Sequence, residues 1–251
     1  MIWIRCLCGV NKMYKFEVIA SLKWYFESKN LSLSNALLLR APLSVENQKD
    51  LRLYYSQYFA SLVSAVEFLS DNKNYPFYKE FVSSLHQSFI FEKFTDGEKN
   101  YSYIRELRNS IVHRGYDISS ASHFINYFPL LIAPLVTKNP TGLKQYPAIG
   151  FYLIEVIEIC EKLIGNIIAT HIESFANKLL VLTDIELLEQ SKQFVIDSVV
   201  MPDWVKQQAL TFFENEDFSK IKVDTTDELI VFLRKNALPL DLISQLKSAQ
   251  L

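Results

Sequence analysis

Apolar side chains recur at helical spacing along most of the 251-residue chain. Phe16, Ile19 and Leu22 repeat every three residues, which predicts an amphipathic helix that begins near residue 14. Ser44 stands just before the next such pattern, where a serine side chain caps a helix N-terminus. The predicted helices cover residues 14–28, 45–72, 76–93, 98–114, 149–180, 183–199, 203–214, 225–236 and 239–249.

Four stretches give a less regular pattern. Residues 31–43 can hold a short helix that ends near Pro42. Residues 119–137 are apolar and aromatic, and we expect them to be helical but broken by two prolines. Residues 138–147 form the clearest loop, and 217–223 is the one place where a short strand is conceivable. The sequence therefore predicts an all-α fold.

The pattern of predicted helices changes near residue 181. Beyond it the predicted helices are shorter, and each is preceded by a capping residue or a proline. We therefore predict a helical bundle over residues 14–180 and a C-terminal helical subdomain over 181–251. Residues 1–13 form an uncertain N-terminal segment, because Met13 is an alternative start.

Composition narrows the function classes. Hydrophobic residues make up 49% of the chain and aromatic residues 14%, which is enough for a sizeable core. The net charge of −2 argues against a basic, nonspecific duplex binder, so any RNA contact must be local. No apolar stretch is long enough to span a bilayer, so we expect no membrane partner. Cys6, Cys8 and Cys160 form neither a disulfide framework nor a zinc-ligand pattern, which favours a reducing cytoplasm.

The most informative stretch of the chain is residues 107–115, which read LRNSIVHRG. On a helix with about 100° per residue, Ile104, Leu107 and Ile111 share one sector and should face the core. The opposite side carries Asn109 and His113, with Arg105, Val112 and Tyr116 beside them and Arg108 at the flank. The helix thus turns an apolar face inward and a cationic, polar face outward.

The outward face also includes apolar side chains, which an ordinary solvated face would lack. Val112 and Tyr116 lie among the cationic groups. Such a mixture is typical of a surface that meets another surface, most simply a second copy across a two-fold axis. In a symmetric dimer, the two copies of Arg108 and His113 could converge on one groove.

The Arg-Asn-x-x-x-His string at 108–113 resembles the signature of the HEPN superfamily, helical-bundle proteins that include many metal-independent ribonucleases. The resemblance covers the motif and the general arrangement of residues 14–180. It implies an HEPN-like up-and-down bundle and a homodimeric endoribonuclease that uses neither a cofactor nor a metal. Similar proteins are toxins of toxin–antitoxin pairs or antiviral-defence effectors, so the implied partners are an RNA substrate and an antitoxin or another defence-system protein.

The implied reaction is attack of a ribose 2′-hydroxyl on the adjacent phosphorus. Histidine can transfer a proton near neutral pH, which suits His113. Arginine presents a charged, planar fork that matches phosphate, so Arg108 would stabilise the developing charge. Asn109 would support both residues. The candidate substrate-binding residues are Arg105, Arg114 and Tyr116.

Other interpretations of the same residues stay open. A cation near a helix C-terminus interacts favourably with the helix dipole, and this alone can explain His113 and Arg114. The fold could also serve as a non-catalytic module for dimerisation and partner binding. Glu67 and Asp71, on the long helix 45–72, share a face and could supply an acidic group that orients the site, or could simply be solvated.

Overall fold

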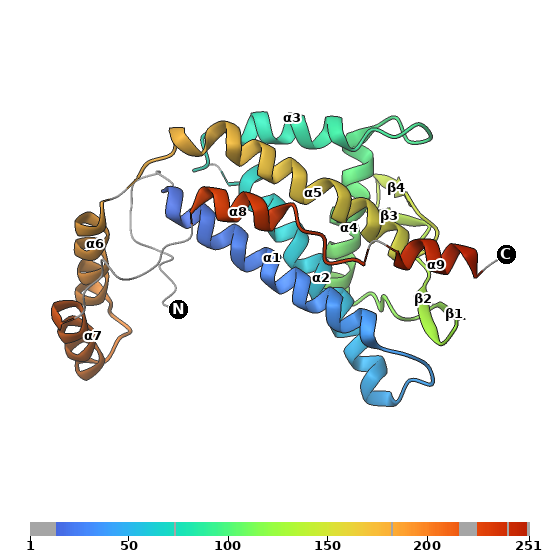
Figure 1. The fold of residues 1–251 in the computed structure, drawn as a ribbon, viewed down its shortest axis with the longest axis horizontal. Helices are drawn as coiled ribbons and strands as arrows, with labels where there is room; N and C mark the ends of the chain where they lie inside the picture. Colours follow the sequence, from blue (N-terminus) through green and yellow to red (C-terminus); the bar gives the residue numbers. More distant parts are fainter. Residues whose placement is uncertain (1–13, 73, 182, 216–224, 240, 250–251) are drawn as a thin grey trace.

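The structure is a computed structural model, and it describes residues 14–249 apart from 73, 182, 216–224 and 240 (Figure 1). The predictions made for residues 1–13, and the short strand considered at 217–223, lie outside the described residues. The structure is 65% helical, and the strands among its described residues form only two small pairs, so the predicted all-α class is confirmed. The helices are α1 (Lys15–Leu38), α2 (Val45–Ser70), α3 (Tyr78–Ser88), α4 (Gly97–Arg114), α5 (Leu153–Phe175), a 3-10 turn (Ala176–Lys178), α6 (Asp184–Asp197), α7 (Asp203–Asn215), α8 (Thr226–Leu233) and α9 (Leu242–Ser248).

The longest helices, α1, α2, α4 and α5, build the bundle together with the shorter α3. α1 and α2 run antiparallel and side by side, and α5 passes over them with α3 at its far end (Figure 1). Their facing sides bury large side chains such as Phe26, Tyr58 and Phe59, none more than 2% exposed. The side chain of Ser44 accepts a hydrogen bond from Asn47 N at 3.1 Å, which confirms the predicted start of α2.

α1 is a single helix of 24 residues, where the sequence suggested a helix over 14–28 and an ambiguous stretch over 31–43. The polar run between them looks like a break, because lysine and serine are seldom buried. In the structure Lys29 and Ser32 are both buried. Lys29 Nζ donates a 2.5 Å hydrogen bond to Glu161 Oε1 of α5, so this lysine belongs to the core and the helix continues through it.

The prediction of a broken helix over 119–137 is wrong. The structure has two antiparallel hairpins instead, β1 (Ser122–Ile125) with β2 (Phe128–Leu131), and β3 (Val136–Lys138) with β4 (Gln145–Pro147). Asn126 and Tyr127 both have positive φ, at 48° and 64°, which is the backbone of a tight hairpin turn. Pro129 is tolerated because both strands of a two-stranded pair are edges. The loop predicted at 138–147 contains the turn between β3 and β4 together with strand β4.

The helices beyond residue 181 fall into two groups, one packed on the bundle and one standing away from it. α8 packs on α1 and α5, and the backbone of Leu233 lies so close to Gly165 that a Cβ there would collide with its carbonyl oxygen. The next segment is also fixed, because Ala237 N donates a 2.7 Å hydrogen bond to Glu161 Oε2. The following helix α9 adds Ile243 and Leu246 to the same hydrophobic core. α8 and α9 therefore share the core of the bundle.

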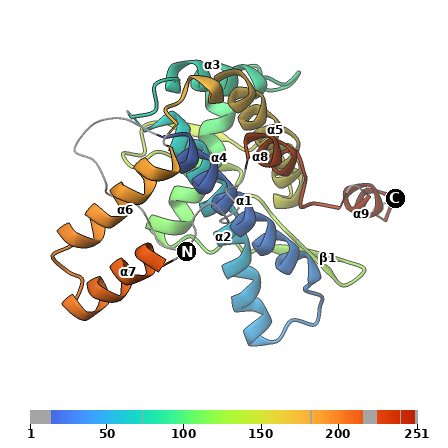
Figure 2. The ribbon, with the colours of Figure 1, turned by 60° about the vertical axis from the view of Figure 1, so that its left-hand side comes forward.

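α6 and α7 form a helical arm that stands away from the bundle (Figures 1 and 2). α6 begins with a capping box in which Thr183 and Glu186 exchange hydrogen bonds, as the threonine at this position predicted. The arm packs mainly on itself and leaves apolar side chains in solvent. They include Ile185, Ile196, Trp204 and Phe212.

A buried histidine sits in an aromatic cluster between α3 and α5. His171 is 5% exposed and packs against Tyr75, Phe81 and Phe175, with ring centroids 4.7–5.6 Å away. Burial lowers the pKa of His171 from 6.5 to about 4, and Glu80 opposes this only weakly. The ring is therefore neutral in the folded protein at pH 7.

This histidine should make folding stability pH-dependent. Between pH 6.5 and pH 4, His171 is protonated in the unfolded chain but still neutral in the folded protein. The free energy of unfolding therefore has its full value above pH 6.5 and decreases as the pH falls through this range. The expected loss is about 3 kcal/mol, from a shift of about 2.5 pKa units at about 1.36 kcal/mol each. Urea unfolding at several pH values should show it, and the loss should be smaller in His171→Leu. An equal slope in both proteins would contradict this assignment.

Candidate functional site

Helix α4 is held at both ends, which fixes the motif it carries. At its start, the Asp96 side chain accepts from Lys99 N at 3.0 Å, and Gly97 packs directly against the backbone carbonyl of His86. Just inside the helix, Asn100 Nδ2 donates at 2.7 Å to the carbonyl oxygens of Phe89 and Phe94. At its end, Gly115 adopts the left-handed conformation with φ 68°, so the predicted closure of this helix by glycine is confirmed.

The core side of α4 lies as its sequence pattern predicted, whereas Arg105, Arg108 and Asn109, which were expected on or beside the outward face, are partly buried. Ile104 and Leu107 are fully buried and Ile111 is 8% exposed, so these three residues form the core side. Val112 is 50% exposed and His113 is exposed beside it. The outward face is therefore available to a substrate or to another protein surface.

Arg108 turns toward α2 and forms an ion pair with Glu67. Its side chain is only 12% exposed, and its Nε is buried without a hydrogen-bond acceptor among the described residues. Burial raises the pKa of Glu67. The positive charge of Arg108 acts to lower this pKa, and the charge of Arg105 does so to a smaller extent. Of the two acidic residues considered from the sequence, Glu67 is the one that orients Arg108. The Nε–H is therefore a hydrogen-bond donor without an acceptor among the described residues, and it is covered from solvent.

Asn109 and Arg114 belong to a second polar group, built around the buried carboxylate of Glu106. Asn109 Nδ2 donates to Glu106 Oε1 at 3.3 Å, and Arg114 Nη2 contacts Glu106 Oε2 at 2.6 Å. Arg114 Nη1 also donates to the Lys138 carbonyl oxygen at 2.6 Å, which ties the β3–β4 hairpin to the end of α4. These contacts give Arg114 a structural role as well as its predicted place at the site.

The structure does not bring Arg108 and His113 into contact within one chain. At about 100° per residue, side chains five positions apart point about 140° from each other around the helix. His113 makes no hydrogen bond or ion pair to any described residue. Arg105 lies near Glu67 on the Arg108 side, and Tyr116 is half-buried beyond the helix end. One protomer thus has a largely buried arginine paired with Glu67 and, on a different side of the helix, an exposed imidazole.

Sequence reasoning missed Glu106 and the hairpin that covers it. Glu106 is 3% exposed, yet an isolated acidic residue on a predicted helix is ordinarily assigned to solvent. Its spacing of three from Asn109 was the available signal, since side chains three apart are neighbours on a helix surface, whereas Arg114 reaches it only through its long side chain. The hairpin was hidden because residues 119–137 were interpreted as helix and 138–147 as a loop.

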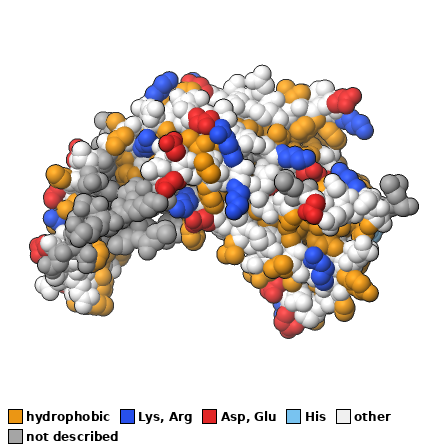
Figure 3. Space-filling model, viewed as in Figure 1, with side chains coloured by type: hydrophobic (Ala, Val, Ile, Leu, Met, Phe, Trp, Pro, Cys, Tyr) orange, Lys and Arg blue, Asp and Glu red, His pale blue; other side chains and the backbone are white. Residues whose placement is uncertain are grey.

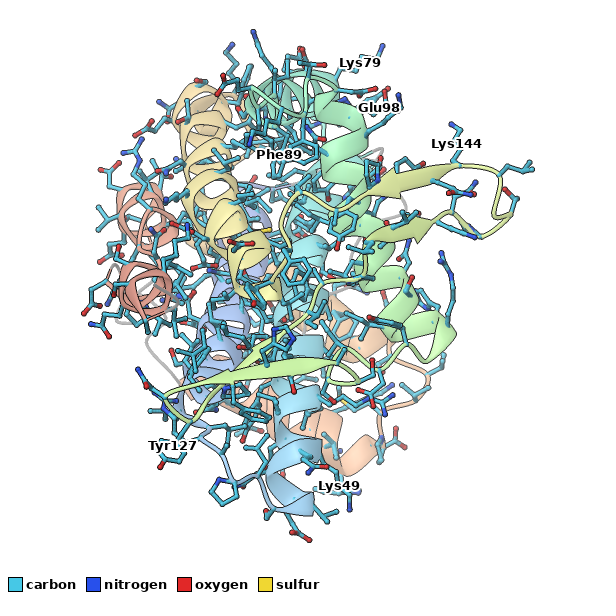
Figure 4. The ribbon with its side chains drawn as sticks, turned by 90° about the vertical axis from the view of Figure 1, so that its right-hand side faces the viewer. Lys49, Lys79, Phe89, Glu98, Tyr127 and Lys144 are labelled. Carbon is cyan, nitrogen blue, oxygen red and sulfur yellow. The ribbon has the colours of Figure 1, made fainter. Side chains whose placement is uncertain are left out.

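Charge is mixed over the surface. Figure 3 shows Lys, Arg, Asp and Glu side chains interspersed on one face, without a large field of either sign. The β3–β4 hairpin projects beside α4 and carries Lys144 near its tip (Figure 4). Positive charge near the motif is therefore local, supplied by α4 and by this hairpin.

Among the described residues, no three His, Cys, Asp or Glu side chains gather closely enough to hold a metal ion. No helix in the described part of the chain combines the length and apolar character needed to cross a membrane.

Comparison with known proteins adds nothing to this geometry. No family model, no curated protein and no solved structure matches the chain.

Proposed function

We propose that the protein is a metal-independent endoribonuclease that cleaves RNA by attack of a 2′-hydroxyl on the neighbouring phosphorus. The observation that carries the proposal is helix α4, which holds a largely buried Arg108, whose Nε–H has no acceptor among the described residues, and an exposed His113 that makes no hydrogen bond or ion pair with any of them. Its resemblance to the HEPN motif supports the same reaction.

Each side chain has a role that follows from its surroundings. Arg108, positioned by Glu67, binds a phosphoryl oxygen and stabilises the charge that builds up in the transition state. His113 is exposed and takes a proton from the 2′-hydroxyl or gives one to the departing 5′-oxygen. Asn109, held by Glu106, presents its remaining amide groups toward the same face. DNA lacks the nucleophile and should not be cut.

A second copy of the chain would complete the site. Arg108 and His113 diverge around one helix, so a single phosphate is better served by the arginine of one protomer and the histidine of the other. The 50% exposed Val112 lies between them and gives a two-fold contact an apolar centre. We therefore propose that the active form is a homodimer that pairs through α4.

The dimer makes a direct prediction at Val112. Val112→Arg should turn the protein from a dimer into a monomer in light scattering, because two like charges would meet at the two-fold axis. Val231→Arg is the matched control, since Val231 is 72% exposed on α8 and distant from α4. A dimer that survives Val112→Arg would place the interface elsewhere.

The test of the function is the chemistry of the product ends. Purified protein is incubated with labelled total RNA in the presence of EDTA, and the 3′ ends are analysed. Fragments with 2′,3′-cyclic phosphate and 5′-hydroxyl ends are expected, because the 2′-oxygen replaces the 5′-oxygen at phosphorus. Products with other ends, or cleavage that EDTA abolishes, would refute the proposed reaction.

The biological setting that fits this activity is a toxin or antiviral-defence effector, controlled by an antitoxin or another defence component. Expression of the wild type should then stop growth, and Arg108→Ala should relieve it.

A non-catalytic dimerisation and partner-binding module is the second candidate. The apolar side chains exposed along the α6–α7 arm favour it, because such surfaces commonly bind other proteins. In that case Val112→Arg would disrupt assembly while substitution of His113 would leave function intact.

A further inference from the structure

A hollow lies next to Arg108, on the other side of Glu67. It has a volume of about 290 Å³, is wide open to solvent, and lies between α1 and the C-terminal end of α2. Two aromatic and four polar side chains line it, namely Tyr25, Phe68, Ser64, Glu67, Asp71 and Asn72. Glu67 lines this hollow and also forms the ion pair with Arg108. Only the Glu67 carboxylate therefore separates a ligand in the hollow from the arginine.

The two carboxylates of the hollow differ in charge balance. Glu67 is compensated by its contact with Arg108 and by the nearby Arg105. Asp71 accepts a 2.9 Å hydrogen bond from the Ser70 hydroxyl and has no cationic partner among the described residues. The hollow therefore offers one uncompensated carboxylate, which favours a ligand with adjacent N–H donors rather than an anion.

The next residue supplies a donor. Asn72 Oδ1 accepts from Asn74 N at 3.1 Å, which leaves the Asn72 amide NH₂ as the group available to a ligand. The apolar part of the hollow comes from Tyr25 and Phe68, whose ring centroids lie 6.4 Å apart at an angle of 59°. Aromatic walls beside paired donors and acceptors are the usual way in which proteins hold an unstacked RNA base.

We propose that this hollow binds a guanine base of the RNA substrate, in a nucleotide next to the phosphate that Arg108 holds; the inference rests on the proposed ribonuclease function. The Watson–Crick edge of guanine carries two adjacent N–H donors and one carbonyl acceptor. The Asp71 carboxylate accepts both donors, and the Asn72 amide donates to the carbonyl. Adenine and cytosine would turn a ring-nitrogen lone pair toward the carboxylate, and uracil offers a single donor between two acceptors.

Binding of nucleoside monophosphates tests the hollow independently of cleavage. Guanosine, adenosine, cytidine and uridine 5′-monophosphates are titrated into the wild type and followed by calorimetry. Guanosine monophosphate should bind about tenfold or more tightly than the other three, which is the discrimination of one good two-bond base contact. Asp71→Asn should remove this preference, because an amide presents a donor where guanine also presents donors.

Asp50→Asn on α2 is the matched control, since it makes the same change near the opposite end of the helix and should leave the preference intact. The same variants are then compared in cleavage of RNA, where wild-type cuts should occur at a fixed position relative to guanine. In Asp71→Asn the cuts should lose that preference, and in Asp50→Asn they should keep it.

The outcomes separate the two proposals. Equal binding of all four monophosphates, or a guanine preference that survives Asp71→Asn, overturns the guanine site whatever the enzyme cleaves. Selective binding of guanosine monophosphate without any RNA cleavage supports the site and removes the ribonuclease proposal.

Discussion

His113→Ala is expected to lower the rate of RNA cleavage by about 10²–10⁴-fold while the protein still folds and dimerises. The imidazole is exposed and makes no hydrogen bond or ion pair with a described residue, so its removal takes nothing from the core. The loss should appear in kcat, because a proton-transfer group acts in the transition state more than in substrate binding. Single-turnover cleavage of a short labelled RNA measures it, with circular dichroism and light scattering as checks on fold and assembly.

The control for this change is His86→Ala. His86 lies on α3, beside the opposite end of α4, and its substitution should leave the cleavage rate unchanged.

Mixed dimers give a stricter test of the shared site. Arg108→Ala and His113→Ala subunits should each be inactive alone and regain part of the activity when mixed, because one of the two sites then has both residues. Full activity of His113→Ala would remove this histidine from the mechanism.

Glu161→Ala is expected to destabilise the protein by about 3–5 kcal/mol, the usual cost of leaving one member of a buried ion pair without its partner. Glu161 Oε1 accepts from Lys29 Nζ at 2.5 Å and from the Tyr58 hydroxyl at 2.9 Å, and Oε2 accepts from Ala237 N at 2.7 Å. Burial lowers the pKa of Lys29, and the Glu161 carboxylate opposes that effect. Without the carboxylate, three donors lose their acceptor in the core.

Urea unfolding measures this loss, and Glu158→Ala is the control. Glu158 lies one turn earlier on α5 and pairs with Lys162, whose side chain is 63% exposed, so its removal should cost less than about 1 kcal/mol. The double variant Lys29→Met with Glu161→Leu should recover much of the stability, since apolar side chains of similar volume can replace a buried pair. Equal stability of Glu161→Ala and Glu158→Ala would show that the buried pair contributes nothing.

The parts of the fold that sequence predicts well are those governed by local chemistry. Ser44, Thr183 and Gly115 mark helix ends because capping and left-handed turns depend on a few neighbouring residues. The buried face of α4 follows from periodicity alone. The outward position of His113 could be predicted for the same reason.

What could not be predicted depends on partners that are distant in the sequence. Lys29 is buried only because Glu161, 132 residues later, supplies its acceptor. The paired role of Glu67 needed the position of α4 against α2, which periodicity does not give. The hairpins over 122–147 were missed because short apolar runs have no decisive period, and the turn at Asn126 and Tyr127 carries no glycine.

The close approach of α8 to Gly165 has a consequence for the order in which the protein folds during synthesis. α1, α2 and α4 leave the ribosome many residues before α8, yet Leu229, Ile230 and Leu233 belong to the same core. Until those residues emerge, the side of α5 at Gly165 that α8 later covers is exposed to water and to chaperones. Glu161 also lacks the hydrogen bond from the amide of Ala237. A ribosome that stops before residue 226 would therefore release a chain with an uncovered core, which quality control can recognise.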